Sequence, residues 1–65
     1  MQVNGAKVTL NDNNLTIAAF LKQGGFAIDR VAVEVNGEII PKNTHDTVIL
    51  KEGDNVEIVS FIGGG

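Results

Sequence analysis

The sequence has no cysteine, tryptophan or tyrosine, and among its 65 residues are one proline, one histidine and three phenylalanines. Without cysteine the chain cannot hold a disulfide, a thiolate metal site or a cysteine nucleophile, and we expect it in the reducing cytoplasm. No basic and apolar leader follows Met1, and no apolar run approaches the roughly 20 residues of a membrane-spanning helix. With these classes excluded, the length and composition of the chain fit one small globular domain.

Positive charge is also scarce, because five Lys and Arg residues face eight Asp and Glu residues, for a net charge of −3. The five bases are scattered along the chain, and three phenylalanines offer few rings for stacking on nucleic-acid bases. This composition disfavours nucleic-acid binding. Complementary charge favours a basic protein partner instead. We expect the chain to be a monomer when free.

Two Asn-Gly dipeptides predict two β-hairpins. Asn4-Gly5 lies in the middle of alternating residues 1–10, and Asn36-Gly37 joins the strand-like segment 30–36 to residues 38–40. A type I′ turn needs positive φ at both central residues, which Asn-Gly tolerates better than almost any other pair. Each dipeptide therefore predicts a tight turn between antiparallel strands.

Residues 16–24 carry the signals of one short helix. Thr16 is suited to cap its first turn, and Gly24 is expected to end it in the left-handed conformation. The apolar stripe of this helix comprises Ile17, Phe20 and Leu21. So short a helix is marginal alone, and we expect it to dock on a sheet.

A last strand is predicted over residues 55–61, and a short strand over residues 47–50. The order is then hairpin, helix, hairpin and strand, which indicates an α+β fold with a mixed sheet and one main helix packed on one face. If the first and last strands run parallel at the centre, the arrangement is the β-grasp, or ubiquitin-like, fold. We assign residues 1–62 to this domain.

The last three residues are Gly63, Gly64 and Gly65. A terminal glycine run loses much entropy if it is ordered, so we predict a flexible tail over residues 63–65. Such an arm has no Cβ atoms and could thread a narrow channel, bringing its carboxylate to chemistry inside another protein.

Three segments together resemble the ThiS family, the ubiquitin-like sulfur carriers of thiamin thiazole biosynthesis. They are the opening strand with its Asn-Gly turn, RVAVEVNGEIIPK at residues 30–42, and EGDNVEIVSFIGGG at residues 52–65. The resemblance extends over the whole chain. It implies a carrier that is not an enzyme and binds no cofactor of its own.

The resemblance also implies how sulfur would be carried. A ThiF-like adenylyltransferase, using ATP and magnesium, would adenylate the Gly65 carboxylate, and a persulfide donor would convert it to a thiocarboxylate. A ThiG-like thiazole synthase would then receive the sulfur. Gly63 and Gly64 would lie in the channel of the activating enzyme.

A docking face for these partners is predicted beside the tail, where alternation turns side chains away from the core. An exposed apolar patch flanked by acids is typical of a protein interface. The predicted docking residues are Ala32, Glu34, Glu57, Val59, Phe61 and Ile62.

Other functions stay open at this stage. The chain could be a related carrier for molybdopterin, cysteine or thio-tRNA synthesis, a noncovalent β-grasp interaction module, or a protein modifier that forms isopeptide bonds. A small enzyme is disfavoured, because no nucleophile stands in a catalytic context and the carboxylates lack metal-ligand spacing. His45 is expected to be an exposed loop residue.

Overall fold

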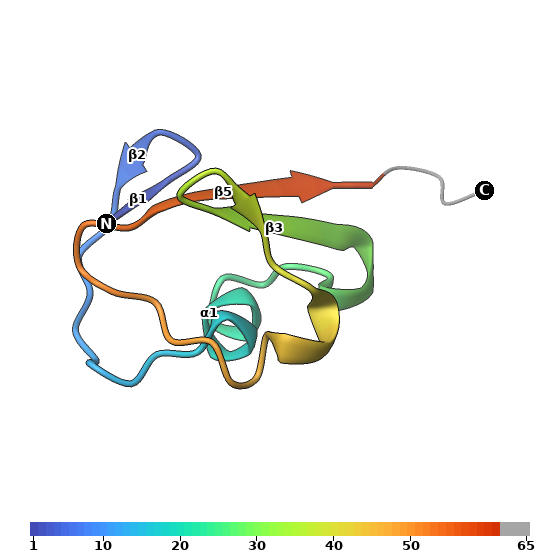
Figure 1. Cartoon of the computed structure of the whole chain (residues 1–65), viewed down its shortest axis with the longest axis horizontal. Helices are drawn as coiled ribbons and strands as arrows, with labels where there is room; N and C mark the ends of the chain where they lie inside the picture. The colour runs from blue at the N-terminus through green and yellow to red at the C-terminus, as the bar shows by residue number, and fades with distance from the viewer. Residues whose placement is uncertain (62–65) are drawn as a thin grey trace.

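A mixed sheet of five strands frames the molecule, with β5 at its centre. The structure is a computed structural model and describes residues 1–61. The strands lie in the order β2-β1-β5-β3-β4, and β1 pairs with β5 in parallel while every other pair is antiparallel. The strands are β1 (Gln2–Val3), β2 (Ala6–Lys7), β3 (Val31–Val35), β4 (Glu38–Ile39) and β5 (Asn55–Ser60). The parallel central pair confirms the predicted topology (Figure 1).

Both predicted hairpin turns are present. Asn4 and Gly5 have φ angles of 51° and 83°, and Asn36 and Gly37 have φ angles of 53° and 86°. The two asparagine side chains also fasten their turns to the central strand. The Asn4 Oδ1 atom accepts a hydrogen bond from the Ile58 amide at 2.7 Å, and the Asn36 Oδ1 atom accepts one from the amide of Asn55, the first residue of β5, at 2.9 Å.

The helix α1 (Ile17–Gln23) begins as predicted, with Thr16 as its cap. The Thr16 Oγ1 atom accepts a hydrogen bond from the Ala19 amide at 3.0 Å. The amides of Ile17 and Ala18 donate to the carbonyl groups of Val48 and His45, at 3.0 and 2.8 Å. Backbone donors that an isolated helix would leave unpaired are thus satisfied by the loop over residues 45–48.

The helix ends one residue differently from the prediction. Gly24 has a φ of −81°, so its assignment to the left-handed position was wrong, and Gly25 takes that position with a φ of +74°. The Gly25 amide donates to the Lys22 carbonyl at 3.2 Å, and the Phe26 amide donates to the Leu21 carbonyl at 3.0 Å. This pair of bonds is a Schellman motif, in which the residue after the cap must be left-handed.

The segment 47–50 is not a strand, contrary to the prediction. Its only ladder contact within the described residues is an isolated bridge between Ile49 and Thr16. The Leu50 amide donates to the Leu15 carbonyl at 2.8 Å, and the Val48 carbonyl accepts from the helix start. The backbone groups of this segment therefore pair with the chain that enters α1, and they are not available to the sheet.

The core lies between α1 and one face of the sheet (Figure 1). Its buried members are Met1, Val3, Leu15, Ile17, Leu21, Val31, Val33, Leu50, Val56 and Ile58. The opposite face of the sheet carries no helix among residues 1–61. None of the helices in this described range is long and apolar enough to cross a membrane.

Candidate functional site

The open face of the sheet holds four of the predicted docking residues in two adjacent cross-strand pairs. Ala32 on β3 lies opposite Val59 on β5, and Glu34 lies opposite Glu57. Their chain neighbours Val31, Val33, Val56 and Ile58 are buried beneath the other face. The predicted alternation is therefore confirmed, and these four side chains share one surface.

A shallow groove of about 220 Å³ runs across this surface. It is lined by Ala32, Glu34, Ile39, Glu57 and Val59. Ile39 and Val59 leave 63% and 57% of their surfaces exposed, and because both line the same groove they form an exposed apolar patch. We define these five residues as the open-face groove.

Ile39 is a groove residue that the sequence prediction missed. It lies on β4, directly opposite Glu34 of β3. The signal was available, because a two-residue turn at Asn36-Gly37 places Val35 opposite Glu38 and therefore Glu34 opposite Ile39. Residues paired in this way project to the same face of a sheet, so the outward position of Glu34 already implied that of Ile39.

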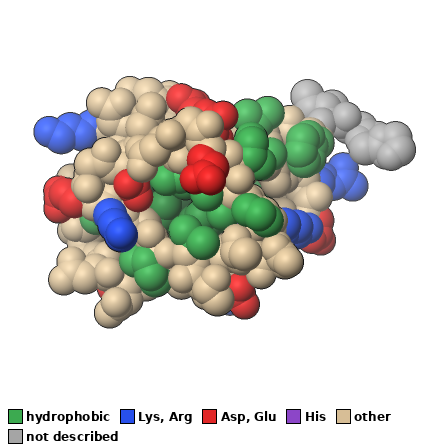
Figure 2. All heavy atoms as spheres, viewed as in Figure 1, with side chains coloured by type: hydrophobic (Ala, Val, Ile, Leu, Met, Phe, Trp, Pro, Cys, Tyr) green, Lys and Arg blue, Asp and Glu red, His purple; other side chains and the backbone are tan. Residues whose placement is uncertain are grey.

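Phe61 stands at the end of the sheet, with 54% of its surface exposed. Its amide donates a hydrogen bond of 2.7 Å to the Arg30 carbonyl, which continues the pairing of β5 with the start of β3. Figure 2 shows hydrophobic side chains gathered on the surface over the end of β5. The predicted site residues Ile62, Gly63, Gly64 and Gly65, and the predicted boundary between domain and tail, lie outside the described residues.

A small charged cluster lies near this end of the sheet. Lys42 forms an ion pair with Asp29, and the lysine hydrogen bond together with its charge holds the pKa of the Asp29 carboxyl below its ordinary value. Both side chains are exposed, so the pair stabilises the fold little. Arg30 follows Asp29 and contributes its carbonyl group to the end of the sheet.

His45 is buried, and its placement as an exposed loop residue was wrong. Only 4% of its surface is exposed. Its Nε2 atom lies 3.0 Å from the Ile40 carbonyl, and its own carbonyl accepts from the Ala18 amide at the start of α1. The ring therefore lies inside the fold against the Ile40 carbonyl, the backbone of His45 pairs with the helix start, and the residue does not line the open-face groove.

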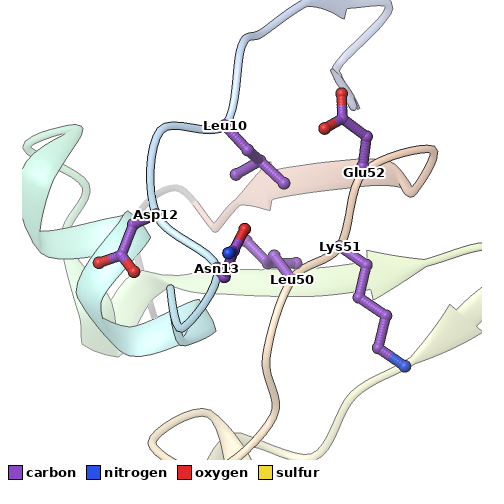
Figure 3. A pocket seen from close by; sticks show the side chains of 6 residues that line it. All are labelled: Leu10, Asp12, Asn13, Leu50, Lys51 and Glu52. Atoms are coloured by element: carbon purple, nitrogen blue, oxygen red, sulfur yellow. The ribbon is translucent and has the colours of Figure 1, made fainter.

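A second hollow lies between the loop before α1 and the turn before β5 (Figure 3). Leu10 and Leu50 point toward its middle, while the charged ends of Asp12, Lys51 and Glu52 spread apart. Within residues 1–61 no group of three His, Cys, Asp or Glu side chains is placed to hold a metal ion. The hollow therefore offers no convergent polar groups, unlike an active site.

The chain resembles a known protein family over its whole length. The sequence model of the ThiS family matches residues 1–65. This chain belongs to the ThiS family.

Relatives of similar length support the membership of this ThiS-family chain. The sulfur carrier protein ThiS of Bacillus subtilis (strain 168) is 38% identical over 65 residues, which are 100% of this chain and 98% of that protein. The crystal structure of the thiamine biosynthesis protein ThiS from Geobacter metallireducens superposes with a TM-score of 0.84 and 35% identity. That superposition covers 98% of this chain and 96% of the other. The β-grasp fold is thereby confirmed.

Much longer proteins match as well. A thiazole synthase of Paramagnetospirillum magneticum is 46% identical over 52 residues, and a thiazole synthase of Magnetococcus marinus is 44% identical over 50 residues. The matches cover 80% and 77% of the ThiS-family chain but only 16% and 15% of the two synthases. The chain thus spans about one sixth of the length of these relatives.

Proposed function

We propose that this chain carries sulfur as a thiocarboxylate on Gly65 and delivers it for formation of the thiamine thiazole. The observation that supports this most is the position of the glycine run. Gly63, Gly64 and Gly65 follow closely on Phe61, the exposed aromatic residue at the end of the sheet, in a chain that matches the ThiS family from end to end. A docking surface and the reacting group are thus a few residues apart.

The chemistry must begin with activation, because a carboxylate has no good leaving group. At neutral pH an α-carboxyl group with a pKa of about 3.3–3.7 is anionic and can attack the α-phosphate of ATP, releasing pyrophosphate. A persulfide sulfur then displaces AMP from the acyl-adenylate. Cleavage of the resulting acyl disulfide by a thiol leaves the thiocarboxylate.

The catalytic groups belong to the partners in this scheme. A ThiF-like adenylyltransferase would supply ATP and magnesium, and a persulfide-bearing protein would supply the sulfur. This chain has no cysteine, so it cannot hold the persulfide itself. The chain itself would dock on these partners. The docking residues would be Ala32, Glu34, Glu57, Val59, Phe61 and Ile62, the residue that follows Phe61.

A thiazole synthase is proposed as the acceptor of the sulfur. Two proteins named thiazole synthase contain a segment similar to this chain. When a carrier-like segment and a synthase belong to one polypeptide, each is present at a high effective concentration for the other. These single-polypeptide relatives support the proposal that this chain acts with a separate ThiG-like thiazole synthase.

Removal of Gly64 and Gly65 separates a carrier from a noncovalent binding module. We expect the truncated chain to bind the adenylyltransferase but to support no thiazole formation in a reconstituted reaction. The unchanged chain serves as the positive control, and a chain with Gly53→Ala controls for a glycine change far from the tail. Thiazole formation by the truncated chain would contradict the proposal.

Phe61→Ser tests the docking role of the exposed ring. Loss of a central aromatic side chain from an interface typically weakens binding by about 1–2 kcal/mol or more, so we expect the KM for the carrier in adenylation to rise about tenfold. The free energy of unfolding should change by less than about 0.5 kcal/mol, because the ring is exposed.

Ile28→Ser is the matched control for Phe61→Ser. Ile28 is also an exposed apolar residue, but it lies in the short 3₁₀ helix Ile28–Arg30, whereas Phe61 directly follows β5, the strand that leads to the glycine run. An unchanged KM is expected for this variant. Equal effects of the two substitutions would contradict a specific role for Phe61.

A further inference from the structure

Two glutamates face each other at the centre of the open-face groove. Glu34 of β3 and Glu57 of β5 are direct cross-strand partners, and both side chains are half-buried. Like charges placed directly opposite each other on a sheet destabilise it. The isolated domain thus carries an unfavourable interaction on a surface that its own core does not use.

The chain provides no counter-charge for this pair within residues 1–61. The ion pair found in that range joins Lys42 to Asp29, and neither glutamate takes part in one. Lys7 is on the same face of the sheet, but it is in register with Gln2, which in turn is opposite Asn55. Lys7 is therefore two strands away from β5, and its row across the sheet meets β5 at Asn55 and not at Glu57.

Apolar side chains flank the glutamates on two sides. Ala32 and Val59 form the adjacent cross-strand pair, and Ile39 is opposite Glu34 on the other side. When a partner covers such a groove it excludes water, and the attraction between a carboxylate and a cation becomes stronger. The groove thus favours a partner with both an apolar group and a positive charge, and a second copy of this acidic chain is disfavoured.

We propose that Glu34 and Glu57 together hold one arginine of the enzyme that activates the tail, while an apolar side chain beside that arginine fills the space between Ile39 and Val59. This inference rests on the proposed function. A planar guanidinium has five donors and can bond to two carboxylates at once, whereas a lysine ammonium is a point charge. Binding relieves the repulsion between the glutamates, so the interaction is specific for the bound state.

The test is the double variant Glu34→Gln/Glu57→Gln, assayed for adenylation by the activating enzyme. Hydrogen bonds to charged groups are stronger than those between neutral groups, so we expect the KM for the carrier to rise at least tenfold. kcat should stay unchanged, and the rise of KM with salt should become shallower. The melting temperature of the free variant should increase, because the repulsion between the two carboxylates is gone.

The control is Glu38→Gln/Glu52→Gln, which removes the same net charge. Glu38 is opposite Val35 and so projects to the other face of the sheet, and Glu52 is in the turn before β5. Equal KM values and salt dependence for the two double variants would overturn the inference while leaving the proposed function intact. A higher KM of the Glu34→Gln/Glu57→Gln variant together with a lower melting temperature would also overturn the inference, because the two glutamates would then stabilise the fold and not the complex. Failure of the unchanged chain to be adenylated would overturn the proposed function as well.

Discussion

Gly64→Phe is expected to abolish activation of the tail while the domain stays folded. If Gly65 reaches the ATP of its partner through a narrow channel, a phenylalanine next to it holds the carboxylate away from the α-phosphate. Misplacement of a reacting group by about 1 Å can lower a rate 100-fold, and we expect at least that loss. The core residues of the described chain all precede Ser60, so the free energy of unfolding should be unchanged.

Pyrophosphate release by the adenylyltransferase measures this effect directly. Gly53→Ala is a suitable control, because Gly53 has a φ of +89° in the turn before β5. An alanine there strains the backbone and lowers stability by roughly 1 kcal/mol, but it leaves the tail as it is. Normal adenylation of the Gly64→Phe variant would contradict the threading of the glycine run.

Leu21→Ala is expected to produce the largest loss of stability. Leu21 is 0% exposed and packs from α1 into the core against the sheet residues. Truncation of a fully buried leucine removes its transfer free energy and leaves a cavity, which together destabilise a protein by about 2–5 kcal/mol. In a domain of this size such a loss lowers the melting temperature by more than about 10 °C.

Ile39→Ala is the matched control for Leu21→Ala. It removes a similar aliphatic side chain from the open-face groove, where most of its surface is already in water. Thermal unfolding followed by circular dichroism should therefore show a change of less than about 0.5 kcal/mol for Ile39→Ala. Adenylation assayed at a temperature where both variants are folded should also distinguish them. Ile39→Ala should raise the KM for the carrier, and Leu21→Ala should leave it unchanged. Similar stability losses would show that the core is placed wrongly.

Features that depend on neighbouring residues were predictable from the sequence. The Asn36-Gly37 turn and the alternation of Val31, Val33 and Val35 determine which side chains of one hairpin share a face. The outward position of Glu57 and Val59 follows in the same way from alternation in β5. The outward placement predicted for Ala32, Glu34, Glu57 and Val59 is therefore confirmed, while their role in docking stays a prediction.

Features that depend on distant segments were not predictable in this way. The direct opposition of Glu34 and Glu57 requires the register between β3 and β5, and no short turn joins these strands. His45 looks like a loop residue in sequence, but its carbonyl group pairs with the start of a helix 28 positions earlier, at Ile17, and its ring contacts the Ile40 carbonyl, so the side chain is buried. The left-handed Gly25 was missed because two adjacent glycines make either position acceptable, and only the hydrogen bonds of the helix end decide between them.

The intact mass of the chain after incubation with an adenylyltransferase, ATP, magnesium and a persulfide source tests the central claim most directly. The account predicts a mass increase equal to the exchange of one oxygen for one sulfur, located on Gly65 and absent when Gly65 is deleted. An unchanged mass, with an enzyme that does modify a known carrier, would contradict sulfur transfer through this terminus.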